Sequence, residues 1–354
     1  MAGTKITAIL RVDPQQPEAA VIARAAAVLR AGGLVAFPTE TVYGLGANAL
    51  DSAAVQGIFA AKERPAYDPL IVHLGQVAEL LQVAATCPPV AETLAARFWP
   101  GSLTLVLPKH ARVPAVVTAG GETVAVRVPQ HPVALALIRA AGVPVAAPSA
   151  NRFGRLSPTC AADVLAELDG RVDLILDAGP TPVGVESTVL SLVTEPPTIL
   201  RPGGVSREAL IEVLGPVALL EQPVTAEQIA PAPGTLAQHY APRARLVLYQ
   251  GERRAVLATM REDALALQAQ GVRVGLWLAD EDLPEVAALD VFTVAAGPAA
   301  DLEQVARQLF ATLRQLDEAG VAVILARDLG AQGIGLAIRD RLTRAAGGHV
   351  IQVA

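Results

Sequence analysis

Two cations, Lys62 and Arg64, stand two residues apart in the stretch FAAKERPAYDPLIVHL, residues 59–74. The pattern predicts the last turn of a helix that carries both cations, a stop at Pro65, and a short apolar strand with His73 near its end. Cations at a helix end, beside a loop and a strand edge, can bind an anion. Taken alone, the stretch also fits a solvated helix end whose positive charges interact favourably with the helix dipole.

Other polar side chains follow predicted strands in the N-terminal part of the chain. They are Thr39, Thr41, Arg127, Ser149, Asn151, Ser157, Ser187, Thr188 and Arg201. Ligands of open α/β sheets bind at the carboxyl ends of the strands. Separated cations with hydroxyl groups between them suit a polyanion, such as a nucleotide triphosphate, together with a carboxylate.

Structural explanations compete with these functional ones. Arg127 lies among valines in VAVRVP, so it needs an anionic partner, either a ligand carboxylate or a buried Asp or Glu. A lone His73 on an apolar strand is compatible with a hydrogen-bonded structural histidine. Ser149 and Asn151 could cap a turn. Glu186 and Asp177 are interpreted as structural, although either could help to place a magnesium ion.

Several familiar motifs are absent from the sequence. It contains no GxxxxGK[ST], no GxSxG, no HExxH and no cysteine cluster. No GxGxxG follows the first predicted strand of the C-terminal part, so a dinucleotide site is not indicated there. The segment GIGLAIRDRL near Gly333 is interpreted as a helix start rather than a phosphate-binding loop.

Composition limits the protein class. With 354 residues, 52% hydrophobic and 18% charged, the chain can bury more than one core, so two domains are expected. A formal net charge of −6 provides no global attraction to nucleic acid. No apolar run approaches the ~18 residues of a membrane span, and no signal-peptide pattern is evident. We therefore expect no membrane partner and a cytoplasmic location.

Strand-like and helix-like segments interleave over residues 1–215, which predicts an α/β domain. Within it, PTETVYGLGAN (38–48) and PSANRFGRLSPT (148–159) are expected to be polar loops. Residues 216–243, rich in Pro and Ala, are expected to form a linker. Over residues 244–354 the apolar runs ARLVLY, VRVGLWL, FTVAA, VAVILARD and HVIQVA alternate with helical patterns, which predicts a smaller domain with a mostly parallel sheet.

Seven blocks occur in a characteristic order: PTETVYGLGANA, KERPAYDPLIVH, FWPGSLTLVL, TVAVRVPQHP, VAAPSANRFGRLSPT, GVESTV and ILRPG. In this order they resemble the YrdC-like domain. Together with PGTLAQHYAP and the C-terminal α/β domain, the chain resembles two-domain threonylcarbamoyl-adenylate synthases. The resemblance implies a twisted mixed sheet around a large, positively lined cavity, plus a smaller Rossmann-like domain.

The resemblance also implies a reaction. L-Threonine, bicarbonate or CO₂, and the substrate ATP would give threonylcarbamoyl-AMP and pyrophosphate, with Mg²⁺ expected and no metal ligand assigned. The product would pass to the tRNA threonylcarbamoyl-transfer machinery, without stable binding of nucleic acid by this chain. The open alternatives are an RNA-binding or ribosome-maturation module and a carbamoyltransferase-type enzyme. The absence of an excess of basic residues argues against the RNA-binding module. The lack of zinc-finger and acylphosphatase-like segments argues against the carbamoyltransferase-type enzyme.

Carried over position by position, the family's KxR motif falls on Lys62 and Arg64, implied to be catalytic and to bind the triphosphate. Its SxN motif falls on Ser149 and Asn151, implied to bind ATP. The positions implied to hold threonine are Thr41, His73, Arg127, the backbone at Ala147, and Ser187. Further nucleotide contacts are implied for Asp68, Thr123, Ser157, Arg201 and Tyr240. At Asp68 the family often has Asn; because an acid repels phosphate, a ribose or adenine contact is the remaining expectation.

Overall fold

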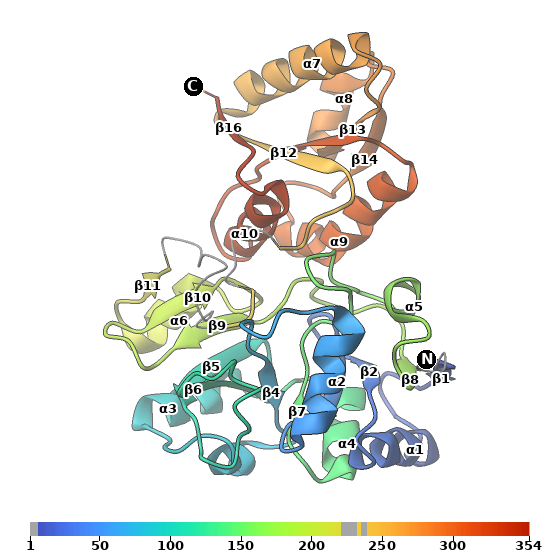
Figure 1. Ribbon diagram of the computed structural model, residues 1–354. Helices are drawn as coiled ribbons and strands as arrows, with labels where there is room; N and C mark the ends of the chain where they lie inside the picture. Colours follow the sequence, from blue (N-terminus) through green and yellow to red (C-terminus); the bar gives the residue numbers. More distant parts are fainter. Residues whose placement is uncertain (1–5, 221–231, 235–238, 354) are drawn as a thin grey trace. The chain divides into compact units, whose positions relative to one another are not determined.

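The computed structural model describes residues 6–220, 232–234 and 239–353. The chain divides into two compact units (Figure 1). Unit 1 comprises residues 1–153 and 157–236, and unit 2 comprises residues 154–156 and 237–354. Among the described residues, no helix combines the length and the apolar character needed to cross a bilayer.

Unit 1 is built on a mixed sheet of 11 strands in the order β1-β8-β2-β3-β7-β4-β6-β5-β9-β10-β11. The strands are β1 (Ala8–Arg11), β2 (Val35–Pro38), β3 (Tyr43–Asn48), β4 (Ile71–His73), β5 (Leu103–Pro108), β6 (Thr123–Arg127), β7 (Val145–Ala146), β8 (Leu174–Asp177), β9 (Thr188–Ser191), β10 (Thr198–Arg201) and β11 (Ala218–Leu219). The helices are α1 (Ala19–Arg30), α2 (Ser52–Lys62), the 3₁₀ helix η1 (Val77–Gln82), α3 (Pro89–Phe98), α4 (Pro132–Ala141), α5 (Ala161–Leu168) and α6 (Arg207–Leu214).

Apolar side chains cover both faces of this sheet. Along β2, Val35 and Phe37 enter one buried cluster with α1 and α4, whereas Ala36 between them enters the other cluster with α2 and α3. Successive side chains of a strand point to opposite faces, so a strand buried on both sides is apolar at every position. The polar groups of unit 1 that do chemistry must therefore lie at strand ends rather than on the sheet faces.

Helix α2 is defined at both ends by local chemistry. The Asp51 side chain accepts hydrogen bonds from the N–H groups of Ala53 and Ala54, which caps the first turn. At the other end Glu63 adopts a left-handed conformation with φ of 55°, one residue after Lys62 and two before Pro65. The predicted helix with Lys62 in its last turn is confirmed, but the expectation that Arg64 also belongs to that turn was wrong, because the left-handed residue Glu63 ends the helix before it.

The expectation of a loop over residues 38–48 was wrong, because β3 occupies its second half and pairs antiparallel with β2. Only residues 39–42 form the turn, closed by the Thr39 hydroxyl, which donates to the Val42 carbonyl at 2.7 Å. The two glycines of YGLGAN suggest a loop, but Gly46 is required because neighbouring side chains leave no room for a Cβ atom there. A Cβ at Gly46 would lie 2.7 Å from a Phe37 ring carbon and 2.9 Å from a Val145 methyl carbon.

Two further elements differ from the expectation. Helix α5 follows the loop at 148–159 and is not indicated by the sequence pattern; its cap residue is Cys160, a weak capping residue, which hides the helix start. Strand β11 lies within the expected linker at 216–243 and pairs in parallel with β10. The part of that segment at 221–231 and 235–238 lies outside the described residues.

Unit 2 contains the predicted parallel sheet, in the order β14-β13-β15-β12-β16. Its strands are β12 (Arg245–Gln250), β13 (Val274–Leu278), β14 (Phe292–Ala295), β15 (Val323–Arg327) and β16 (Val350–Gln352). Its helices are α7 (Arg253–Ala269), the 3₁₀ helix η2 (Asp280–Asp282), α8 (Leu283–Val286), α9 (Leu302–Glu318) and α10 (Gly335–Ala346). Met260 of α7 packs in a cluster with Leu276, whereas Trp277 donates to Thr312 of α9 at 2.9 Å. Helices thus cover both faces, as in Rossmann-like folds.

Gly203 should be irreplaceable because of where its Cα lies. A Cβ there would sit 2.3 Å from the Glu186 carbonyl oxygen and the Thr188 nitrogen, which are backbone atoms that cannot turn away. We expect Gly203→Ala to lower the free energy of unfolding by about 3 kcal/mol, measured by urea denaturation. Gly57→Ala is the matched control: its Cβ would make ordinary contact with Leu34 at 3.5 Å, so a gain of roughly 0.5–1 kcal/mol is expected. Equal stability of Gly203→Ala and the wild-type chain would contradict the packing argument.

Candidate active site

Lys62 is buried at the end of α2, with 1% of its surface exposed, and it holds a loop. Its ammonium donates to the Ser149 carbonyl at 2.6 Å and to the Asn151 carbonyl. The Phe153 N–H in turn donates to the Lys62 carbonyl at 2.9 Å. Burial lowers the pKa of Lys62 well below its usual value, and Arg64 lowers it further. Lys62 therefore joins the end of α2 to the SxN segment. The alternative interpretation, in which Lys62 is a solvated residue at a helix end, was wrong.

Arg64 is also held by the protein. Its Nε donates to the Asp68 carbonyl at 3.1 Å, and its Nη2 donates to the Pro69 carbonyl at 2.8 Å. The same Nη2 lies 2.9 Å from a carboxylate oxygen of Asp68, and both side chains are buried. The guanidinium lies over the Phe153 ring, 5.9 Å from its centroid. The short loop after Arg64 thus bends back and surrounds the cation.

Arg127, at the end of β6, has an internal acidic partner that the sequence reasoning left open. Its Nη2 bonds to the buried carboxylate of Glu40, its Nη1 donates to the Thr41 hydroxyl at 3.0 Å, and its Nε donates to the Gly101 carbonyl at 3.0 Å. Burial raises the pKa of Glu40, but Arg127 and the backbone donors outweigh this effect, so the pKa lies below its usual value. The signal for Glu40 was present in the sequence, because an arginine between valines requires an anion.

His73 ends β4 and pairs in register with Arg127 of β6. Burial, followed by the charge of Arg127, lowers the pKa of His73 to about 3, so the imidazole is neutral at physiological pH. Its Nδ1 is buried and has no hydrogen-bond partner in the part of the chain that the structure describes. Buried polar atoms are normally hydrogen-bonded, so this nitrogen is a candidate ligand contact rather than a satisfied structural group.

Ser187 and Arg201 form a second polar group beside β9. The Ser187 hydroxyl lies 2.8 Å from that of Thr104, and Arg201 donates to the Ser187 carbonyl at 2.9 Å and to its hydroxyl at 3.2 Å. Burial raises the pKa of Asp68, and the charge of Arg201 is one of the effects that oppose this rise, so the two side chains are close enough to interact. Asp68 therefore connects the KxR pair with Arg201.

The remaining expected site residues lie in several places. Ser157 donates to the buried carboxylate of Glu186, and the Ala147 N–H donates to the Ile71 carbonyl at 2.9 Å. Thr123 opens β6 and is half-buried. Tyr240 belongs to unit 2, where its ring lies 4.8 Å from the Arg341 guanidinium. The structure thus groups most of the expected residues at the strand ends of unit 1, and Tyr240 is not among them.

The described part of the chain contains no preformed magnesium site made of protein ligands. Among the described residues, no group of three or more His, Cys, Asp or Glu side chains could hold a metal ion. Glu40 is occupied by Arg127, and Glu186 accepts from Ser157. Asp177 accepts from the Gly179 N–H at 3.1 Å, so it acts as a turn residue.

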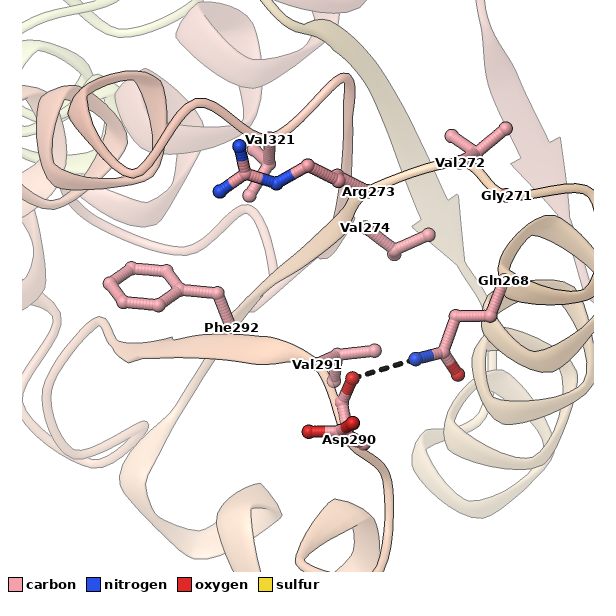
Figure 2. A pocket seen from close by; sticks show the side chains of 9 residues that line it. All are labelled: Gln268, Gly271, Val272, Arg273, Val274, Asp290, Val291, Phe292 and Val321. Carbon is pink, nitrogen blue, oxygen red and sulfur yellow. Dashed lines mark hydrogen bonds between the residues drawn. The ribbon is translucent and has the colours of Figure 1, made fainter.

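A pocket of about 390 Å³ lies in unit 2 (Figure 2). Its lining is mixed: Val274 and the half-exposed Phe292 of the edge strand β14 contribute apolar surface, and Arg273 contributes a cation. The Gln268 amide donates to the Asp290 carbonyl across one side. None of the expected site residues lines this pocket.

Comparison with known proteins agrees with this arrangement. A family profile described as "Telomere recombination" matches residues 27–203, and one described as "Threonylcarbamoyl-AMP synthase, C-terminal domain" matches residues 205–347. The threonylcarbamoyl-AMP synthase of Bacillus subtilis is 46% identical over 341 residues, covering 96% of this chain and 95% of the relative. The chain belongs to the threonylcarbamoyl-AMP synthase family. The Pyrococcus abyssi member is 45% identical over 332 residues, covering 93% and 95% of the two chains.

Solved structures extend the likeness to the fold. A crystal structure of the Pyrococcus abyssi protein complexed with L-threonine superposes with a TM-score of 0.92 and 43% identity, covering 98% of this chain and 100% of that one. The structure of Escherichia coli YciO matches with a TM-score of 0.50 and 25% identity, covering 56% of this chain and 96% of that one. The family membership and the two-domain α/β fold expected from the sequence are confirmed.

Lys62 acts as a clamp, because its ammonium joins the end of α2 to the carbonyls of Ser149 and Asn151. We therefore expect the shape of this side chain to matter as much as its charge. In Lys62→Arg a planar fork would replace a compact ammonium at a fully enclosed site, so the loop at 149–153 should lose its alignment. We expect pyrophosphate formation to fall roughly a hundredfold and amide exchange of residues 149–153 to accelerate. Lys109→Arg, at the half-exposed end of β5, is the matched control and should behave like the wild type. Wild-type rates and exchange in Lys62→Arg would show that Lys62 is not a clamp.

The depressed pKa of His73 makes the fold sensitive to acid. Below pH 6.5 the unfolded chain binds a proton at His73, whereas the folded chain does not until about pH 3. Stability should therefore fall with decreasing pH by about 1.4 kcal/mol per pH unit from this residue. His73→Asn should flatten the dependence of the free energy of unfolding on pH between about 6 and 4.5, measured by urea denaturation. An unchanged slope would mean that folded His73 binds protons.

Proposed function

We propose that this chain is an L-threonylcarbamoyladenylate synthase that forms threonylcarbamoyl-AMP and pyrophosphate from L-threonine, bicarbonate or CO₂, and ATP. One observation carries the assignment in unit 1. Three buried basic side chains, Lys62, Arg64 and Arg201, are all close enough to act on the charge of Asp68, in a chain with similarity over nearly its full length to named synthases. Buried cations of this number suit a nucleotide triphosphate.

The reaction needs positioning more than covalent help from the protein. The neutral amine of threonine attacks the carbon of CO₂ and loses a proton, which gives a carbamate. A carbamate oxygen then attacks the α-phosphorus of ATP, and the bond to the bridging oxygen breaks as pyrophosphate leaves. In-line displacement of this kind is accelerated mainly by alignment and by neutralisation of the phosphate charge. Arg64 would neutralise the triphosphate, and Lys62 would keep the SxN segment in place beside it.

Arg127 has the capacity to bind the threonine carboxylate. A guanidinium carries five N–H donors, and in the described part of the chain Arg127 uses three of them, toward Glu40, Thr41 and Gly101. Two N–H groups remain for a second anion. Because Glu40 already balances the charge of Arg127, we assign it the role of orienting the guanidinium rather than contacting ATP.

Neighbouring groups complete the proposed threonine site. His73 Nδ1 is a buried polar atom without a partner among the described residues, and its ring is neutral, so it can hydrogen-bond the amine or hydroxyl of threonine. Thr41 and Ser187 offer hydroxyls, and the backbone at Ala147 is proposed as a further contact. The expected nucleotide contacts at Ser149, Asn151, Thr123, Ser157 and Arg201 stay proposals.

Magnesium is proposed to arrive with the ATP phosphates. The described residues provide no cluster of ligands that would hold the ion before the nucleotide binds. Mg²⁺ commonly binds through substrate phosphates, waters and at most one or two carboxylates. The ion would supply further neutralisation of the triphosphate charge.

Tyr240 and the segment at 216–243 are proposed to act as a lid over the nucleotide, on the strength of the sequence resemblance alone. Tyr240 is buried in unit 2 with φ of 60°, and it packs against Phe310 and Arg341. Any test of the lid should therefore use Tyr240→Phe, which keeps this packing, beside Tyr240→Ala. Transfer of the product to the tRNA-modifying machinery and a cytoplasmic location are likewise proposed.

An RNA-binding module is the weaker alternative. The cations of unit 1 discussed above are buried and hydrogen-bonded to protein groups, whereas a phosphate backbone is bound by exposed cations. The net charge of −6 gives no compensating long-range attraction.

The proposed function predicts a strict dependence on three substrates. Pyrophosphate release from ATP should require both threonine and bicarbonate, and mass spectrometry should detect threonylcarbamoyl-AMP. Serine should react at roughly a tenth of the rate, because a small apolar pocket senses its missing methyl group. Pyrophosphate or phosphate release that is independent of threonine would identify a plain nucleotide hydrolase instead.

A further inference from the structure

Asp68 is an acid at a place where the proposed function needs positive charge. Its surface is fully buried, and the charges that face it are those of Arg64, Lys62 and Arg201. By the family resemblance this position often holds an uncharged Asn, whereas this chain has a carboxylate there.

Asp68 forms an ion pair with Arg64, the cation that we propose to bind the triphosphate. A carboxylate oxygen of Asp68 lies 2.9 Å from Arg64 Nη2, and the Asp68 carbonyl accepts from Arg64 Nε. Arg64 is the one ion-pair partner of the carboxylate among the described residues. A triphosphate that binds Arg64 must therefore compete with the Asp68 carboxylate for the same cation.

From this geometry we infer that Asp68 is an internal counter-ion: it competes with the triphosphate of ATP for Arg64 and takes up a proton as the triphosphate binds. The inference rests on the proposed function, because it places the phosphates at Arg64. It replaces the expectation of a ribose or adenine contact at this position with a role in setting affinity for the triphosphate.

The direction of the proton transfer follows from the surroundings of Asp68. Burial raises the pKa of the carboxyl group and outweighs the opposing effects of Arg64, Lys62 and Arg201. The carboxylate is thus nearer to protonation than an exposed aspartate. Phosphate charges placed beside it would favour the protonated form further, since like charges in one site cannot both stay ionised. A protonated Asp68 no longer opposes the triphosphate.

The test compares Asp68→Asn with the wild-type protein in calorimetric titrations with a non-hydrolysable ATP analogue, inorganic triphosphate and AMP. Asp280→Asn, at the start of η2 in unit 2, is the control for loss of one negative charge. We expect Asp68→Asn to bind the ATP analogue and triphosphate about tenfold more tightly, with AMP little changed. Equal changes for AMP and ATP, or weaker binding of triphosphate, would overturn the inference and favour the ribose or adenine contact.

Proton uptake provides a second measurement that needs no stable variant. Titration of the wild-type chain near neutral pH, in buffers of different ionisation enthalpy, should show more protons taken up with the ATP analogue than with AMP. Affinity for the analogue should weaken as the pH rises, and both effects should be absent from Asp68→Asn. Absence of this excess uptake in the wild-type chain would overturn the inference. Because these titrations measure binding only, their failure is separable from a failure to form threonylcarbamoyl-AMP.

Discussion

The need to satisfy the buried ammonium of Lys62 organises the centre of the candidate site in unit 1. An unpaired lysine in the interior would cost several kcal/mol, so Lys62 must have acceptors. The chain supplies them from main-chain carbonyls at Ser149 and Asn151, which lie 87 and 89 residues further along the sequence. The end of α2 and the segment after β7 are thereby fixed to each other. Strand β3 holds the same segment from its other side, since the Ala150 N–H donates to the Tyr43 carbonyl at 2.8 Å.

Near Lys62, two buried arginines each have an internal acidic partner. Arg64 faces Asp68 and Arg127 faces Glu40, both within unit 1. Buried ion pairs contribute little net stability, because desolvation offsets their attraction, yet removing one partner leaves an expensive isolated charge. The main effect of these ion pairs is to fix the positions of the side chains. They keep long, flexible side chains in fixed directions, so that substrates meet an arrangement of charges that needs little reorganisation.

Sequence patterns predict those elements of this protein that are determined by neighbouring residues, such as strands formed by apolar runs. The five strands of unit 2 follow from apolar runs, most clearly β13 and β15, which are buried at every position. Strand β3 escapes the same reasoning because Gly46 is needed for close packing against Phe37 and Val145, and glycine also signals turns. The motifs predict Lys62 and Arg127 as site residues, but not their partners. Glu40 meets Arg127 across 87 residues, and no local pattern encodes such a contact.

A three-residue segment makes the folding of unit 2 depend on the order in which the chain is synthesised. Residues 154–156 belong to unit 2, and the Gly154 carbonyl accepts from the Ala241 N–H at 2.8 Å, while Arg155 bridges to Ala241. During translation this segment emerges long before the chain that it pairs with. Unit 2 therefore reaches its complete set of contacts only by closing a loop of more than eighty residues, a slow, non-local step. A polypeptide cut after residue 236 would leave residues 154–156 without their partner at Ala241, so the folding of unit 2 depends on a segment that is synthesised within unit 1.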